Sequence, residues 1–269
     1  DADTSPANWM LGSAAYQESD EFLQGKHNAH NFIIDGDFTQ WPEGTSVSIT
    51  VANTYGPALW RSAHSSGAAR FDILRSTDVP TVAQSGHQSL YSMHIDVTTA
   101  DASTAAGDLV AMQYAITGYD LQRLAGQTFT LSFWVKADII GTHTVILKNN
   151  LSNRALIKEY EIDVADTWEK KSITMTHNTT GTWEYDADMG MIVAFGLQCG
   201  TAFHTLPNQW AATNTWGSPN QVNDMSSTAN DIRFAQVQLN LGSKALPFYQ
   251  PSIATVEDQV EYYVERHGN

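Results

Sequence analysis

The chain has 269 residues, of which 42% are hydrophobic and only 16% are charged, well below the roughly 25% of charged residues that is usual for soluble domains. Acidic residues outnumber basic ones 29 to 14, so a formal charge of −15 disfavours nucleic acid as a partner, and without an apolar run of 18 residues no membrane insertion is expected. Because Cys199 is the one cysteine, an internal disulfide and a cysteine-rich metal cluster are excluded.

The first 30 residues are polar and small, and their apolar residues recur with neither the period of a strand nor that of a helix. Trp9, Tyr16 and Phe22 are isolated apolar anchors in this stretch. We interpret residues 1–30 as an N-terminal arm or connector. Residues 31–269 are then expected to form one domain.

Short apolar segments separated by turn residues fill most of this domain, at spacings that are typical of β-sheets. Because no helical run lies between them, the pattern predicts an antiparallel β-sandwich and not a fold of alternating strands and helices. A jelly roll is the expected topology of this all-β chain. The ten predicted strands are Phe32–Phe38, Val47–Val51, Arg70–Leu74, Tyr91–Val97, Leu109–Ile116, Gln127–Ala137, Thr142–Lys148, Trp168–His177, Met189–Gln198 and Ile232–Leu239.

The segment Gln127–Ala137 shows the alternation most clearly. Successive side chains of a strand point to opposite faces of the sheet. Its apolar side chains should therefore enter the core together, while the residues between them face outward. The predicted core residues of this strand are Phe129, Leu131, Phe133 and Val135.

The last third of the chain departs from the strand pattern twice. Residues Gly200–Asn230 contain two tryptophans, two prolines and several asparagines without periodicity, which predicts a long surface loop between the last two core strands. Valines at a spacing of four, after Pro251, predict a short C-terminal helix over Thr255–Arg266.

No arrangement of residues typical of an enzyme active site is found. In the segment Asp35–Phe38 a phenylalanine takes the place that a nucleophilic serine has in one esterase motif. A pair of glycosidase carboxylates is recognisable only by its separation in space, and in so acidic a chain a chosen pair is typically a solvated one. His27 and His30 lie three residues apart without a third ligand at metal spacing. We therefore expect a non-enzymatic protein with no metal and no cofactor.

Aromatic residues are the more informative candidates. Sugar rings present apolar C–H faces that stack on aromatic rings, while neighbouring amides and carboxylates bind the hydroxyls. Four residues are predicted as a carbohydrate-binding site, two in a turn-rich segment and two in the long loop: Trp183, Tyr185, Trp210 and Trp216. The alternative, which is the commoner role of a loop tryptophan, is that each ring pins its loop to the core or packs against a neighbouring chain.

Three groups of motifs resemble a known type of domain. The opening resembles that of the jelly-roll domains of bacteriophage tail-fibre and other virion-fibre proteins, in N-F-I-I-D-G-D-F (residues 31–38) with Trp41 and Gly44. The middle is similar to a core shared with carbohydrate-binding modules, in L-A-G-Q-T-F-T-L-S-F-W-V-K-A (residues 124–137) and Thr167-Trp168. The end resembles that of the phage domains, in A-Q-V-Q-L (residues 235–239), Gly242-Ser243, Pro247-Phe248 and Tyr262-Tyr263.

The resemblance, which extends in order over residues 31–265, implies a virion structural protein from a phage tail fibre, spike or head fibre. Such a protein would be located on the virion, would form a homotrimer and would bind a host cell-surface polysaccharide. The arm, residues 1–30, would contact other virion proteins. In carbohydrate-binding relatives two carboxylates hold a structural calcium, and because Thr39 and Ala235 stand at the corresponding positions no calcium is expected here.

Two other functions fit the same sequence. The chain could be a carbohydrate-binding module that accompanies a polysaccharide-degrading enzyme, in which case it would bind sugar as a monomer. It could instead be a purely structural capsid or collar component, with Trp210 and Trp216 buried between subunits. Oligomeric state and glycan binding separate these functions.

Overall fold

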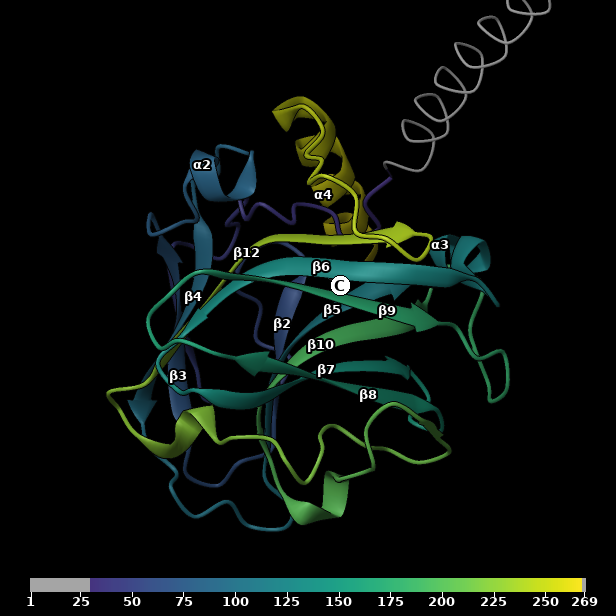
Figure 1. Ribbon diagram of the computed structural model, residues 1–269. Helices are drawn as coiled ribbons and strands as arrows, with labels where there is room; N and C mark the ends of the chain where they lie inside the picture. Colours follow the sequence, from purple (N-terminus) through teal and green to yellow (C-terminus); the bar gives the residue numbers. More distant parts are fainter. Residues whose placement is uncertain (1–29, 268–269) are drawn as a thin grey trace, which may run out of the picture.

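The computed structural model describes residues 30–267, with side chains described as far as residue 263, and the fold is the predicted antiparallel β-sandwich (Figure 1). The arm predicted for residues 1–30 and the His27 position lie outside the described residues, apart from residue 30 itself. The strands are β1 (Ser46–Ile49), β2 (Trp60–His64), β3 (Arg70–Ser76), β4 (Ser92–Thr99), β5 (Leu109–Thr117), β6 (Thr128–Ala137), β7 (Gly141–Asn149), β8 (Ala155–Ile162), β9 (Glu169–Thr176), β10 (Met189–Cys199), β11 (Trp210–Ala211) and β12 (Asp231–Leu241). The helices are α2 (Val82–Ser85), α3 (Gly118–Leu124) and α4 (Ile253–His267), and two short 3₁₀ turns, η1 (Thr201–Phe203) and η2 (Asp224–Ser226), lie between β10 and β12.

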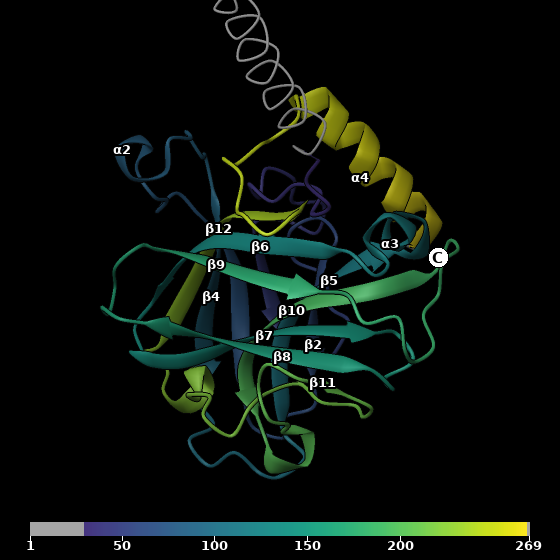
Figure 2. The ribbon, with the colours of Figure 1, turned by 45° about the vertical axis from the view of Figure 1, so that its right-hand side comes forward.

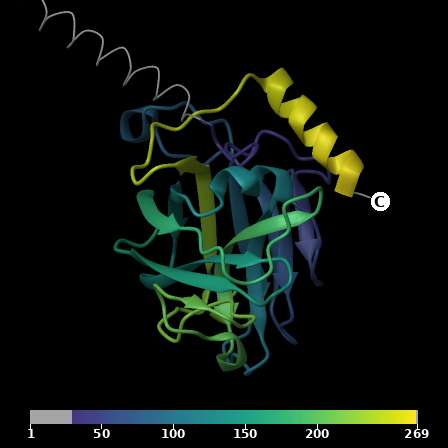
Figure 3. The ribbon, with the colours of Figure 1, turned by 90° about the vertical axis from the view of Figure 1, so that its right-hand side faces the viewer.

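Two six-stranded sheets form the sandwich. Sheet A has the order β1-β3-β4-β12-β6-β9, and sheet B has the order β11-β8-β7-β10-β5-β2. Neighbouring strands are antiparallel in both sheets, and β12 pairs with β4 and β6 although it is far from both along the chain. This interleaving of distant strands between two sheets is the jelly-roll arrangement (Figures 2 and 3).

The core lies between the sheets, and strand periodicity predicts its residues well. The four side chains expected to point inward from β6, Phe129, Leu131, Phe133 and Val135, are all fully buried. Fully burying one such side chain contributes roughly 1.5–3 kcal/mol to the free energy of unfolding. The alternation of β6 therefore settles which of its faces is the core face.

Chain segments cover part of the outer face of each sheet. On sheet A, the hydroxyl of Thr130 donates to the carbonyl of Gly242, and the side-chain amide of Gln238 donates to the carbonyl of Leu246. On sheet B, Ile146, Ile192 and neighbouring small residues form a second apolar cluster under the long loop. Outward-facing residues such as Ser132 and Trp134 are consequently buried, which alternation alone does not predict.

The prediction of a strand over Phe32–Phe38 is wrong, because this segment is a series of turns. Asp35 and Phe38 have positive φ angles of 53° and 54°, which lie in the left-handed region and outside the range of regular strands. The Asp35 carboxylate accepts hydrogen bonds from the amides of Thr39 and Gln40. A side chain that binds the nearby backbone in this way competes with sheet pairing, so the apolar alternation is overridden.

The prediction that no helix lies between the strands is also wrong. Helix α3 follows β5 directly, and Thr117 caps it by accepting a hydrogen bond from the amide of Asp120. Helix α2 begins with a capping box formed by Thr81 and Gln84. Helix α2 has four residues and helix α3 has seven, so neither is long enough to show a helical period in the sequence.

Strands β2 and β8 were not among the predicted ones. Strand β8 has the sequence A-L-I-K-E-Y-E-I, in which most residues favour helices, but pairing with β7 along its whole length makes it a strand. Strand β2 has only five residues and pairs with β5 at the edge of sheet B. Tertiary pairing therefore decides the structure of both segments.

The predicted C-terminal helix is confirmed as α4, which begins two residues before the expected Thr255. Val256 and Val260 are buried against Ala58, Leu59 and Ile34, as their spacing of four predicts. Helix α4 lies at the opposite end of the molecule from the long loop in all three views (Figures 1–3). Among the described residues, no helix is long and apolar enough to cross a membrane.

Gly36 provides a test of the close contact between the opening turns and sheet A. The carbonyl of Gly36 accepts a hydrogen bond of 2.8 Å from the amide of Val237, and a Cβ at this glycine would lie far inside van der Waals distance of the Val237 carbonyl oxygen. We expect Gly36→Ala to lower the free energy of unfolding by about 2 kcal/mol or more, because the backbone must shift. Thermal and denaturant unfolding measure this loss.

Gly107→Ala is the matched control, because nothing lies within 4 Å of a Cβ at Gly107. This variant should change the free energy of unfolding by less than about 0.5 kcal/mol. Equal stability of the two variants would contradict the close contact at Gly36.

Candidate functional site: a cleft at the free edge of strand β2

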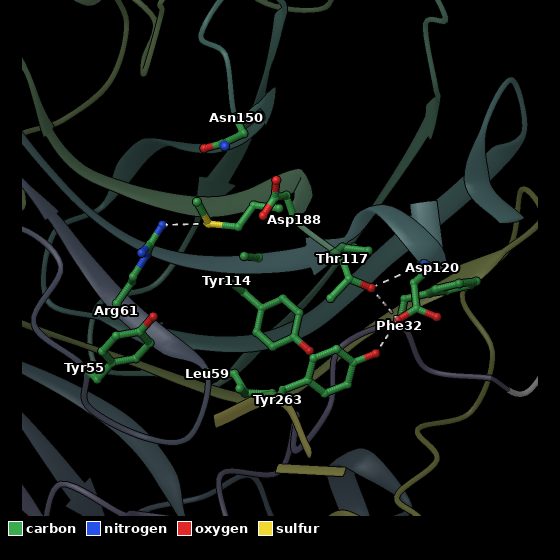
Figure 4. Close-up of a pocket in the computed structure, with 13 residues that line it drawn as sticks. Phe32, Tyr55, Leu59, Arg61, Tyr114, Thr117, Asp120, Asn150, Asp188 and Tyr263 are labelled. Atoms are coloured by element: carbon green, nitrogen blue, oxygen red, sulfur yellow. Dashed lines mark hydrogen bonds between the residues drawn. The ribbon is translucent and has the colours of Figure 1, made fainter. Parts of the chain in front are cut away.

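A cleft of about 170 Å³ lies where strand β2, the end of β5, helix α3 and helix α4 meet (Figure 4). Because β2 is the last strand of sheet B, side chains from both faces of the sheet reach this edge. The lining combines aromatic rings with charged and amide groups, in Phe32, Tyr55, Leu59, Arg61, Tyr114, Ala115, Ile116, Thr117, Asp120, Asn150, Asp188, Met189 and Tyr263.

Arg61 and Tyr55 form one end of the cleft. The guanidinium carbon of Arg61 lies 6.0 Å from the centre of the Tyr55 ring, within the range of a cation–π contact. A terminal guanidinium nitrogen of Arg61 also lies 2.9 Å from the sulfur of Met189. Strand pairing holds both residues in position, because Arg61 pairs with Gln113 of β5 and forms an isolated bridge with Tyr55.

Asp120 forms the other end, at the first turn of α3. Its carboxylate accepts hydrogen bonds of 2.9 Å from the Tyr263 hydroxyl and 3.3 Å from the Thr117 hydroxyl. Burial and the nearby Asp120 carboxylate raise the pKa of Tyr263 to about 12, so the phenol remains protonated and donates to Asp120 at neutral pH. Helix α4 thereby contributes a ring and a hydroxyl to the cleft.

Tyr114 lies between these two ends (Figure 4). Its ring is buried against Trp60, at 5.4 Å between ring centres, and its hydroxyl accepts a hydrogen bond from the amide of Ile34. Burial raises the pKa of Tyr114 far above its ordinary value. The base of the cleft is therefore a fixed, uncharged aromatic surface.

Gly118 brings the segment with Asp188 and Met189 to the cleft. The amide of Gly118 donates a 2.8 Å hydrogen bond to the carbonyl of Asp188, and a Cβ at Gly118 would collide with the backbone of Glu184 and Asp186. Only glycine permits this approach of α3 to the segment before β10. Asn150 reaches the same rim, and its amide lies 3.4 Å from the Glu184 carboxylate.

The structure brings two of the four predicted aromatic residues together. The ring centres of Trp183 and Trp210 lie 6.0 Å apart in an edge-to-face arrangement, and the ring centre of His177 lies 4.3 Å from that of Trp183. The indole of Trp183 donates to the carbonyl of Thr180 and only 8% of the residue is exposed, whereas Trp210 is half-buried. These rings anchor strand β11 and the turns after β9.

Trp216 lies apart from that pair and pins the long loop to sheet B. It is 7% exposed and belongs to the apolar cluster on the outer face of the sheet. The buried ammonium group of Lys148 lies 4.0 Å from the centre of the Trp216 ring, and the indole donates to Asn214. Burial lowers the pKa of Lys148 to about 8. Any sugar stacked on Trp216 would first have to displace this loop.

Tyr185 is the most accessible of the four, at 37% exposed. Tyr185 precedes Asp188 of the cleft by three residues, and its carbonyl accepts a hydrogen bond from the side chain of Gln122 on α3. The four residues therefore do not form one surface. Sugar stacking by these residues stays a prediction.

The residues of the cleft were not found by sequence reasoning, except that the Tyr262-Tyr263 pair belongs to the closing motif. Arg61 lies in a strand that was not predicted, Tyr55 precedes that strand, and Asp120 lies in an unpredicted helix. The one local signal is the T-G-Y-D sequence at 117–120, which has the form of a helix N-cap followed by an acid.

Metal binding receives no support from grouped side chains. Across the part of the chain that the structure describes, no three His, Cys, Asp or Glu side chains are placed to hold a metal ion. His30 instead contacts Phe32 edge to face, at 4.7 Å between ring centres.

Comparison with known proteins finds no matching family model and no matching curated protein. The structure is similar to a tailspike protein 4 domain of bacteriophage CBA120, with 12% identity, a TM-score of 0.39 and coverage of 79% of this chain but 21% of that one. It is also similar to a family 4 carbohydrate-binding module, with 18% identity, a TM-score of 0.40 and coverage of 78% and 100%. A family 11 carbohydrate-binding module from Clostridium thermocellum aligns at 10% identity and a TM-score of 0.36, covering 72% of this chain and 96% of that one.

His177 makes the Trp183 and Trp210 cluster sensitive to acid. Burial lowers the pKa of His177 to about 4 from an ordinary value of 6.5, and the amide of Gly126 donates to Nδ1 of its neutral ring. Because the unfolded chain takes up this proton first, the stability that the neutral ring contributes is lost as the pH falls from about 6.5 to about 4. Over this pH range the free energy of unfolding should fall by up to about 3 kcal/mol more in the unchanged protein than in His177→Gln, which has no group that titrates at this position.

Urea unfolding at pH 7.5, 6 and 4.5, followed by tryptophan fluorescence, measures the difference. The comparison at pH 7.5 is the control, because residue 177 is uncharged there in the unchanged protein and in the variant, so that only its packing differs. Parallel stability curves for the two proteins between pH 6.5 and 4.5 would show that His177 is not the group that titrates.

Proposed function

We propose that this protein is a non-enzymatic carbohydrate-binding protein of a bacteriophage virion, in a tail fibre, spike or head fibre, and that the β2-edge cleft binds the host-surface polysaccharide. The observation that carries the sugar-binding part is the composition of the cleft. Its aromatic surfaces suit the C–H faces of a sugar, and its carboxylate, amide and guanidinium groups suit the hydroxyls.

The rigidity of the cleft supports the same function. Sugar sites discriminate by fixed hydrogen-bond geometry, which requires that the binding groups be held before the ligand arrives. Here strand pairing positions Arg61, the cap of α3 positions Asp120, and core packing positions Tyr114. Tyr185, exposed near the rim segment, is the predicted aromatic residue that a longer glycan could reach without displacing the chain.

The virion part of the proposal is supported by the ordered motifs over residues 31–265 that resemble phage fibre domains. In a trimeric fibre, three weak sites held on one particle bind a repetitive polysaccharide far more tightly than one site does, because the later contacts are intramolecular. Residues 1–30 would provide the attachment to other virion proteins.

Glycan binding is tested on an array of bacterial surface polysaccharides and their oligosaccharides, followed by calorimetry with the glycan that binds. We expect Tyr55→Ala to weaken binding at least tenfold, which is about 1.4 kcal/mol, because one ring face and the partner of Arg61 are lost. Tyr185→Ala should weaken binding of long oligosaccharides more than of short ones.

Tyr249→Ala is the matched control, because Tyr249 is also an exposed tyrosine, at 48%, and does not line the cleft. It should bind as the unchanged protein does. No binding to any glycan would overturn the proposed function, and unchanged binding by Tyr55→Ala would exclude the cleft as the site.

The virion role predicts that the full 269-residue chain sediments as a trimer in analytical ultracentrifugation. A monomer that still binds polysaccharide would instead favour a module attached to a polysaccharide-degrading enzyme. A trimer without glycan binding would favour a structural capsid or collar component.

A further inference from the structure

The guanidinium group of Arg61 has no anionic partner in the cleft. Within residues 30–263, whose side chains are described, no carboxylate lies within 4.0 Å of a guanidinium nitrogen of Arg61. Among the described residues, its side chain donates to the thioether sulfur of Met189, which is a weak acceptor, and lies over the face of Tyr55. A half-buried arginine with five donors is thus left with most of them facing the cleft or water.

The carboxylates that line the cleft do not compensate this charge. Asp120 already accepts from the hydroxyls of Tyr263 and Thr117. Figure 4 shows Arg61 and Asp120 at opposite ends of the cleft, with Tyr114 between them. Asp188 is exposed on the rim and makes no ion pair with Arg61. The two ends of the cleft therefore differ in sign.

We propose that the polysaccharide bound here is acidic, and that Arg61 binds an anionic substituent of its sugar, a carboxylate or a phosphate, while the sugar ring lies against Tyr55 and its hydroxyls reach Asp120. This inference rests on the proposed function of the cleft. It adds the class of ligand, which the composition of the cleft alone leaves open.

The chemistry of the guanidinium group favours an anion over a neutral sugar. A planar fork of donors matches a carboxylate or a phosphate with two parallel hydrogen bonds. The hydroxyls of a neutral sugar can also accept from Arg61, but without an opposite charge they compensate less of the hydration that the guanidinium group loses.

The acidic net charge of the chain does not prevent this binding. The formal charge of −15 repels an anionic polymer at long range, but interactions are largely screened beyond about 8 Å at physiological ionic strength. The local field at Arg61 therefore decides the contact. Association should be slower at low salt, where repulsion by the whole chain extends further.

The test compares each acidic glycan with its own neutral form, using the full chain. Oligosaccharides of hyaluronan, alginate and polygalacturonate are the carboxylate probes, and the same oligosaccharides with their carboxyl groups reduced to alcohols are the neutral probes. Phosphomannan with and without enzymatic dephosphorylation is the phosphate probe. The carboxylate and phosphate arms thus identify the source of the anion.

We expect at least one acidic probe to bind at least tenfold more tightly than its neutral form, and Arg61→Gln to remove this preference. Arg61→Lys should recover only part of it, because an ammonium group lacks the planar fork. Arg75→Gln is the matched control, because Arg75 also stacks on a tyrosine, Tyr91 at 4.3 Å, but lies on sheet A. This control should bind as the unchanged protein does.

Equal binding of the acidic and neutral forms, or an unchanged preference in Arg61→Gln, would overturn the inference. If neutral glycans bind and Tyr55→Ala abolishes that binding, the proposed function survives and only the acidic ligand is wrong. If no glycan of either form binds to the folded protein, both the proposed function and the inference fail.

Discussion

A column of aromatic rings that crosses the sandwich is the interaction on which the rest of the structure depends. Phe234 of sheet A stacks on Phe195 of sheet B at 4.0 Å, and Phe195 stacks on Trp60 at 5.6 Å with the rings nearly parallel. The three strands involved, β12, β10 and β2, are far apart along the chain, so the column forms only when both sheets are in place. Trp60 in turn packs on Tyr114, which places the β2 edge and its cleft against the same core.

The chain itself covers part of the outer face of each sheet, whereas the β2 edge carries the cleft. Trp216 holds the long loop on sheet B, while the segment after β12 satisfies Thr130 and Gln238 on sheet A. Buried polar groups require such partners, so removing either covering segment would be unfavourable. At the proposed site a ligand would meet side chains that strand pairing and core packing already hold in place.

Most strands and the final helix could be predicted from the sequence, because a two-residue or four-residue spacing of apolar side chains reports a buried face directly. Prediction failed where a local side chain overrode the pattern, as Asp35 does in the opening turns, or where pairing overrode propensity, as in β8. The cleft could not be predicted, since Tyr55, Asp120 and Tyr263 come from parts of the chain separated by up to some two hundred residues. No spacing rule connects residues that only strand order brings together.

The sequence by itself determined the all-β class, the inward residues of strands such as β6, the helix at the C-terminus and the absence of an internal disulfide. These follow from periodicity and composition, which are local properties of a chain. Only the tertiary structure decided that Trp216 serves to hold a loop and that Arg61 stands in a cleft where no carboxylate of the described side chains pairs with it. Burial and charge pairing depend on distances through space, and those distances are set by the order and register of the strands.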